Sequence, residues 1–174
     1  MSGLTALGRK RRAARTPAEI LTQLEEHPRR LSEIAAVGPR DRLNDTRFLG
    51  IWTANDVLAH LRCCSDAGAA AIRGLAVSDG SVVRFTGPRA LIEQVDYRDR
   101  EFAQNVRAFT RQRRSLLVLL RGLPRARWSR DGRTSDGGPV RVRSILDFGQ
   151  WLARHEERHL DALARFARRG VSHR

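Results

Sequence analysis

The stretch WLARHEERHL, residues 151–160, places His155 and His159 four positions apart in a segment with helical periodicity. Four residues advance an α-helix by about 6 Å and by about 40° around its axis, so both imidazoles point to the same side and can bind one ion. Both occupy positions where the apolar pattern of the segment would place Leu or Val. The alternative is a pair of core histidines, but each neutral imidazole would then need its own hydrogen-bond partner, whereas a metal satisfies both.

A third ligand is available in WTANDVLAHL, residues 52–61, where His60 falls on the inner side of another predicted helix. If this helix runs antiparallel to the one that carries His155 and His159, His60 lies within a turn or two of His159. Three histidines with an open position are typical of catalytic rather than structural metal sites. Zn²⁺, Ni²⁺ and Fe²⁺ all accept neutral nitrogen ligands. We therefore predict that His60, His155 and His159 bind a divalent transition metal.

The same short sequence pattern predicts the start of three helices. Thr16, Thr53 and Ser144 are each followed three residues later by an acid, which is the pattern of an N-terminal capping box. Apolar residues then recur every three or four positions, which predicts helices over about 17–37, 54–76, 90–121 and 145–168. Pro28 is expected to bend the first of them. Residues 79–86 and 130–143 are expected to contain short extended pieces. The fold class is therefore all-α, a four-helix bundle with long loops between the helices.

Length and composition set further bounds. A chain of 174 residues fits one domain, expected over residues 16–170, after a disordered basic tail over residues 1–15. The net charge is +14, but Lys10 is the only lysine and the arginines are spread over every segment, without a nucleic-acid-binding motif. The sequence therefore does not favour nucleic acid as a partner. The adjacent Cys63 and Cys64 form no disulfide framework, and neither an export signal nor an apolar run of membrane-spanning length is present, which predicts a cytoplasmic protein with no membrane partner.

Several stretches together resemble the DinB/YfiT-like superfamily of small bacterial four-helix proteins. They are WTANDVLAHL (52–61), DYRDREF (96–102), FTRQRRSLL (109–117) and ARHEERHL (153–160), and the resemblance extends over roughly residues 16–168. It implies an up-down-down-up bundle, a divalent metal held by the three matching histidines, and often a homodimer. Some relatives use low-molecular-weight thiols such as bacillithiol or mycothiol as cosubstrates. The segment FLGI (48–51) departs from the polar, proline-containing approach of relatives, so the rim of the site does not carry over.

Other residues have two interpretations each. Arg113 interrupts an apolar face, either as a buried pair with an acid such as Asp147 or Glu101, or as a cofactor-binding residue that orients an anionic substrate or thiol near the metal. Asp56 caps its helix and is one turn before His60, whose ring it could orient. His27 and Cys64 lie near apolar stripes and are interpreted as core residues, with a role as fourth ligand as the alternative.

These observations favour an enzyme that uses the open metal position to activate water or a thiol, hence a hydrolase or a thiol transferase acting on a small molecule. No general base can be assigned. A pocket at the end of the bundle, lined partly by residues 38–52 and 122–143, is expected beside the metal. The alternative is a structural metal with a closed fourth position, in a non-enzymatic or stress-associated protein.

Overall fold

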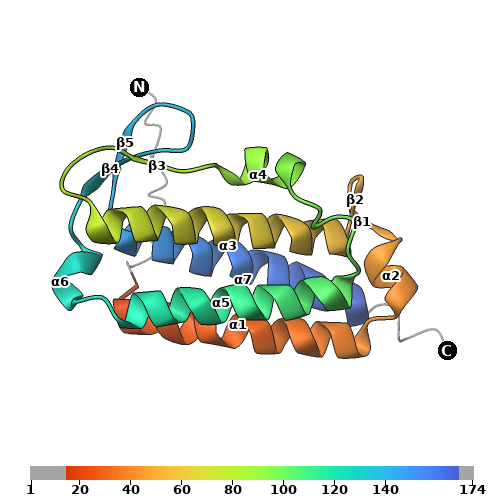
Figure 1. Ribbon diagram of the computed structural model, residues 1–174. Helices are drawn as coiled ribbons and strands as arrows, with labels where there is room; N and C mark the ends of the chain where they lie inside the picture. Colours follow the sequence, from red (N-terminus) through yellow and green to blue (C-terminus); the bar gives the residue numbers. More distant parts are fainter. Residues whose placement is uncertain (1–14, 169–174) are drawn as a thin grey trace, which may run out of the picture.

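Four long helices lie side by side in the computed structural model, which describes residues 15–168 (Figure 1). They are α1 (Pro17–Val37), α3 (Ala54–Val77), α5 (Phe102–Arg121) and α7 (Ile145–Arg168). The predicted four-helix bundle is confirmed, and so are the predicted helices over 17–37 and 145–168 and, to within one residue, the one over 54–76. The predicted basic tail lies outside the described residues except for Arg15, which forms an ion pair with Glu157 at 3.0 Å.

The capping boxes explain where three of these helices begin. The Thr16 hydroxyl accepts a hydrogen bond from the backbone of Glu19, and the Glu19 carboxylate accepts one from the backbone of Thr16. Thr53 and Asp56 form the same reciprocal pair at the start of α3. At the start of α7, Ser144 N donates to Asp147 at 2.8 Å. Each pair satisfies backbone N–H groups that the first turn of a helix leaves free.

The prediction of one continuous helix over residues 90–121 is wrong. The chain forms a short helix, α4 (Pro88–Gln94), leaves the helical path, and starts α5 at Phe102. Asn105, buried in α5, donates to Tyr97 O at 2.8 Å, and Glu101 provides a new N-terminal cap. Hydrogen bonds to the carbonyl groups of the segment before α5 thus stabilise a folded-back turn in place of a helix.

Short elements close the two ends of the bundle (Figure 1). At one end, α2 (Arg40–Asn44) is followed by the antiparallel strands β1 (Arg47–Leu49) and β2 (Trp52–Thr53). At the other end lie α6 (Arg125–Trp128) and a three-stranded sheet of β3 (Val83–Arg84), β4 (Gly132–Ser135) and β5 (Arg141–Arg143). Strand β4 pairs in parallel with β3 and antiparallel with β5. The extended pieces predicted within 79–86 and 130–143 are confirmed.

Polar contacts show which helices run in the same direction. Contacts advance together along α1 and α7, and along α3 and α5, so each of these pairs is parallel. Helices α3 and α7 are antiparallel, because His60 contacts His155 while Gly68, further along α3, packs against Leu152. The parallel contacts are Gln23–Ala153, His27–Glu156 and Arg30–Asp161 for the first pair, and Asn55–Asn105 and Arg62–Gln112 for the second.

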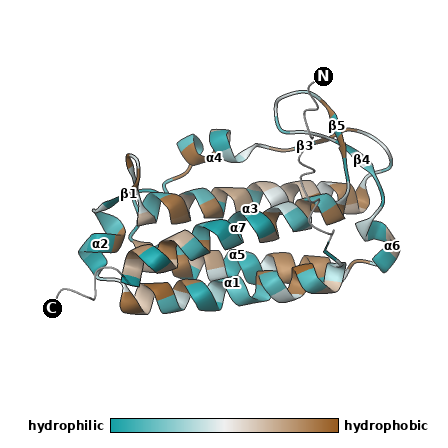
Figure 2. Ribbon diagram, turned by 180° about the vertical axis from the view of Figure 1, so that it is seen from behind, coloured by the Kyte–Doolittle hydropathy of each residue, from teal (hydrophilic) through white to brown (hydrophobic). Residues whose placement is uncertain are grey.

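The core consists of two apolar clusters separated by a buried polar layer. One cluster lies toward α6 and includes Leu24, Leu116 and Leu152; the other lies toward α2 and includes Leu31, Phe109 and Leu160. Three polar residues occupy the helical positions between them, namely His27, Arg113 and Glu156. In Figure 2 the middle of α1 is coloured hydrophilic; several of its charged residues are exposed, whereas His27 is buried. None of the helices in the described part has the length and apolar character needed to cross a membrane.

Candidate metal centre

His60 from α3 and His155 and His159 from α7 converge midway along the bundle. Each offers one ring nitrogen, and the three ligand nitrogens lie within 4.8 Å of one another. The closest approach, 3.1 Å, is between His60 Nε2 and His155 Nε2. The antiparallel packing of α3 and α7 therefore brings together the three residues that the sequence singled out. That they bind a metal stays a prediction at this point.

The histidines lie at the edge of the buried face of α7, not in its centre. The centre of that face is formed by residues at spacings of four and three, Leu152, Glu156, Leu160 and Leu163, each fully buried. His155 and His159 are half-buried, and so is His60. The interpretation that both histidines of α7 replace core leucines is therefore wrong by about one position, and the shift leaves the ring nitrogens within reach of solvent.

The surroundings of the three imidazoles keep them neutral. Burial lowers the pKa of all three, and for His155, where positive charge on His159 and His60 also opposes protonation, the pKa falls to about 4. At neutral pH each ring therefore has a nitrogen lone pair available for a metal. The donor set fits a divalent transition metal, because three neutral nitrogens converge and no carboxylate of residues 15–168 completes the group.

Two tryptophans flank the histidines. Trp52 contacts His60 edge to face, with 5.6 Å between ring centroids, and Trp151 stacks on His155 at 5.8 Å. Both indoles therefore form part of the wall around the three imidazoles. The capping role of Asp56 is confirmed, and its second carboxylate oxygen accepts a hydrogen bond from Arg98 at 2.8 Å. Within the described chain, no hydrogen bond joins this carboxylate to a ring nitrogen of His60.

Cys64 lies beneath the histidine cluster. Its Sγ is 3.5 Å from His60 Nε2 and 3.6 Å from His155 Nε2, and the side chain is 1% exposed. Burial raises the pKa of this thiol above its usual range. A protonated, buried thiol behaves as a small apolar side chain, which agrees with the interpretation of Cys64 as a core residue.

Glu156 is a buried functional residue that the sequence did not single out. Glu156 is fully buried, accepts a hydrogen bond from Arg113, and lies 2.6 Å from His27 Nδ1. Its spacing of four from both Leu152 and Leu160 was the signal that could have found it. Arg113 is thus buried in an ion pair, as one interpretation had it, but its acid is Glu156 in place of Asp147 or Glu101. A cofactor-binding role for Arg113 stays a prediction, and its 1% exposure does not favour it.

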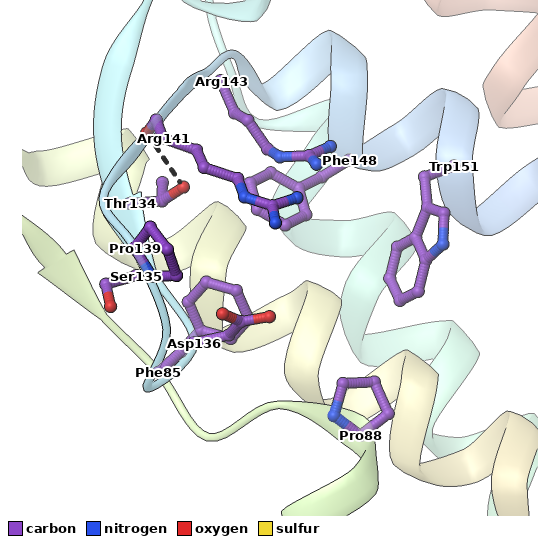
Figure 3. A pocket seen from close by; sticks show the side chains of 10 residues that line it. All are labelled: Phe85, Pro88, Thr134, Ser135, Asp136, Pro139, Arg141, Arg143, Phe148 and Trp151. Carbon is purple, nitrogen blue, oxygen red and sulfur yellow. Dashed lines mark hydrogen bonds between the residues drawn. The ribbon is translucent and has the colours of Figure 1, made fainter.

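A cavity of about 210 Å³ is lined in part by Trp151, the residue that stacks on His155 (Figure 3). The part of the expected pocket lining that falls in residues 122–143 is found, since strands β4 and β5 and the turn between them form one wall. Residues 38–52 do not line this cavity; Phe85 and Pro88, which precede and begin α4, take that place. His27 is not a member of the histidine cluster, because it lies on α1 and its Nδ1 contacts Glu156 in the buried polar layer.

Together the fold and the cluster define a four-helix protein with three convergent histidines. Residues 23–163 match the family model of the DinB superfamily, and the chain belongs to this superfamily. Among solved structures it is similar to YfiT from Bacillus subtilis, with a TM-score of 0.73 and 19% identity over 94% of this chain and 93% of that one. YfiT is described as a probable metal-dependent hydrolase with an unusual four-helix bundle topology. A comparison with curated proteins gave no match.

Proposed function

We propose that this protein is a metal-dependent hydrolase in which His60, His155 and His159 hold one Zn²⁺, Ni²⁺ or Fe²⁺ ion. The observation that carries the proposal is the convergence of three ligand nitrogens within 4.8 Å on half-buried side chains. The description of YfiT as a probable metal-dependent hydrolase supports it. The parallel and antiparallel helix pairs described above support the up-down-down-up order that the resemblance implies. We further propose a small-molecule substrate, a cytoplasmic location and a homodimer.

The contacts of the neighbouring carboxylate support an open coordination position on the metal. Glu156, the nearest carboxylate in sequence, is turned away from the cluster toward Arg113 and His27. When bound at three histidines, a divalent metal lowers the pKa of a coordinated water toward neutrality. The protein's own contribution is to hold three imidazoles neutral and oriented, while Trp52 and Trp151 cover the sides of the site. The three rings are only half-buried, which supports access to the ion from solvent.

The site is tested by measuring the metal content of protein purified without a histidine tag. We expect about one equivalent of a transition metal, and its loss in a His155→Ala/His159→Ala variant. His27→Gln is the matched control, since it changes a histidine of the same bundle outside the cluster and should leave the metal content unchanged. A protein that stays metal-free after supplementation with Zn²⁺, Ni²⁺ and Fe²⁺ would contradict the proposal.

The reaction is tested on the metal-loaded protein with a panel of small esters and amides. Hydrolysis that disappears in the His155→Ala/His159→Ala variant supports the proposal. Mycothiol and bacillithiol with a small electrophile form the second arm, because an open metal position also binds thiolates. If only the thiols react, the proposed activity is wrong and the protein is a thiol transferase.

A further inference from the structure

The cavity that Trp151 lines contains two arginines that form no ion pair among the described residues. Arg141 and Arg143 are two residues apart on strand β5, so their side chains leave the same face of the sheet. Figure 3 shows both guanidinium groups directed toward Phe148 inside the cavity. Unlike Arg113 or Arg98, neither takes part in an ion pair within residues 15–168. Two unpaired guanidinium groups that converge on one cavity are a ready site for an anion.

The rest of the cavity wall is mostly aromatic. Phe85 and Phe148 contact each other edge to face, with 5.7 Å between ring centroids, and Arg143 lies 5.9 Å from the Phe148 ring. Trp151 forms the side that leads toward the histidines. Aromatic walls bury apolar surface and favour a ring or an alkyl chain as the body of the ligand.

The charge of the lining selects among anions. Asp136 lies opposite the two arginines and exposes its carboxylate to the same cavity (Figure 3). Two positive charges and one negative charge leave a single net positive charge, which fits a monoanion and disfavours a dianion such as a phosphate monoester. The planar fork of a guanidinium also matches a carboxylate.

The position of the cavity relates it to the histidines. Phe148, Trp151 and His155 follow one another on successive turns of α7, and the seven residues from Phe148 to His155 span about 10 Å. We propose that Arg141 and Arg143 bind the carboxylate of an aromatic or apolar monocarboxylate, whose other end passes Trp151 and reaches the three histidines. This inference rests on the proposed function for the bond that reacts, whereas the binding of the carboxylate does not require a metal.

The binding is tested by calorimetry on protein kept metal-free with a chelator, with phenylacetate as the probe. Phenylacetamide has the same shape without the charge, and phenyl phosphate is a dianion with a similar ring. We expect phenylacetate to bind at least about tenfold more tightly than either, because charge-assisted hydrogen bonds to guanidinium groups are lost or opposed. Equal affinity for phenylacetate and phenylacetamide, or no binding of phenylacetate at millimolar concentration, would overturn the proposal.

Two variants assign the effect to the cavity. Arg141→Gln/Arg143→Gln should weaken phenylacetate binding at least about tenfold, whereas Arg130→Gln/Arg133→Gln, which removes the same charge from exposed residues outside the cavity, should not. A similar loss in both would show a general effect of net charge and overturn the proposal.

Asp136→Asn should selectively improve the binding of phenyl phosphate. Phenylacetate binding to a protein that takes up no metal would support this inference while contradicting the proposed hydrolase, so the two failures are distinguishable.

Discussion

His27 Nδ1 lies 2.6 Å from Glu156 Oε2, and neither side chain is more than 1% exposed. The other carboxylate oxygen of Glu156 accepts a hydrogen bond from Arg113, so one acid connects α1, α5 and α7 inside the bundle. This connection is adjacent in sequence to His155. With Glu156 directed into the core, the adjacent His155 lies at the edge of the buried face.

Removal of the Glu156 charge is expected to destabilise the protein strongly. In Glu156→Gln, the guanidinium of Arg113 stays buried without a compensating charge, and two of its nitrogens already have no hydrogen-bond partner among the described residues. Breaking one side of a buried ion pair costs about 3–5 kcal/mol. Urea unfolding, monitored by helical circular dichroism, measures the loss.

The adjacent residue provides a matched control for this substitution. Glu157 pairs with Arg15 at 3.0 Å, but its side chain is 35% exposed. Glu157→Gln should therefore cost less than about 1 kcal/mol, as is usual for ion pairs that solvent reaches. Equal losses in the two variants would show that the buried layer contributes no more than the surface pair.

Cys64→Ala is expected to leave the metal content unchanged. The Cys64 Sγ approaches two of the three histidines, but it is not among the side chains whose ligand atoms all converge within 4.8 Å, and it is buried beneath them. Absorption of the Co²⁺-substituted protein provides the measurement, because a cobalt–thiolate bond adds a strong charge-transfer band. Such a band, absent in Cys64→Ala, would make Cys64 a fourth ligand and favour a structural metal.

Zinc should raise the thermal stability of the metal-free protein. At a free Zn²⁺ concentration of about 100 times Kd, binding adds about 2.7 kcal/mol, which corresponds to a rise in Tm of roughly 5–11 °C for a chain of this size. His60→Gln should abolish this rise, because α3 supplies only one of the three ligands and two histidines bind weakly. His27→Gln should lower the starting Tm but preserve the rise. Persistence of the full rise in His60→Gln would remove His60 from the site.

Much of the fold was predictable from local signals. Thr16, Thr53 and Ser144 placed three helix starts correctly, because a capping box depends only on residues three apart. The break before Phe102 was not predictable in this way. It depends on Asn105, which reaches Tyr97 O and Asn55 on a different helix, and such contacts exist only once the bundle has formed.

The three residues of the candidate site were predictable from the sequence, but the side of α7 that faces the core was not. Spacing alone identified His155 and His159, and His60 followed from the antiparallel packing of two helices. Glu156 lies in the centre of the buried face of α7, where it contacts Arg113 from α5 and His27 from α1. A hydrophobic pattern counts a buried charged residue as polar. The pattern therefore predicted a buried face centred on the histidines and not on Glu156.

The metal-free protein should become less stable as the pH falls from about 6.5 toward 4, because its three clustered histidines resist protonation. Burial, followed by repulsion from the neighbouring histidines, lowers the pKa of His155 to about 4, and burial also lowers the pKa of His60 and His159. In the unfolded chain these histidines titrate near pH 6.5. Between these values the unfolded state binds more protons than the folded state, so the free energy of unfolding falls as the pH falls from about 6.5 toward 4.

Urea unfolding in the presence of a chelator, repeated at a series of pH values, measures this dependence. We expect a decrease on the order of 1 kcal/mol between about pH 6.5 and pH 5. His155→Gln/His159→Gln should flatten the decrease because these two groups no longer titrate, whereas Glu157→Gln should retain it. Saturating Zn²⁺ should shift the decrease to lower pH, since the metal competes with protons for the same ring nitrogens. A free energy of unfolding that stays constant over this range would show that solvent reaches the three imidazoles too freely for burial to hold them neutral.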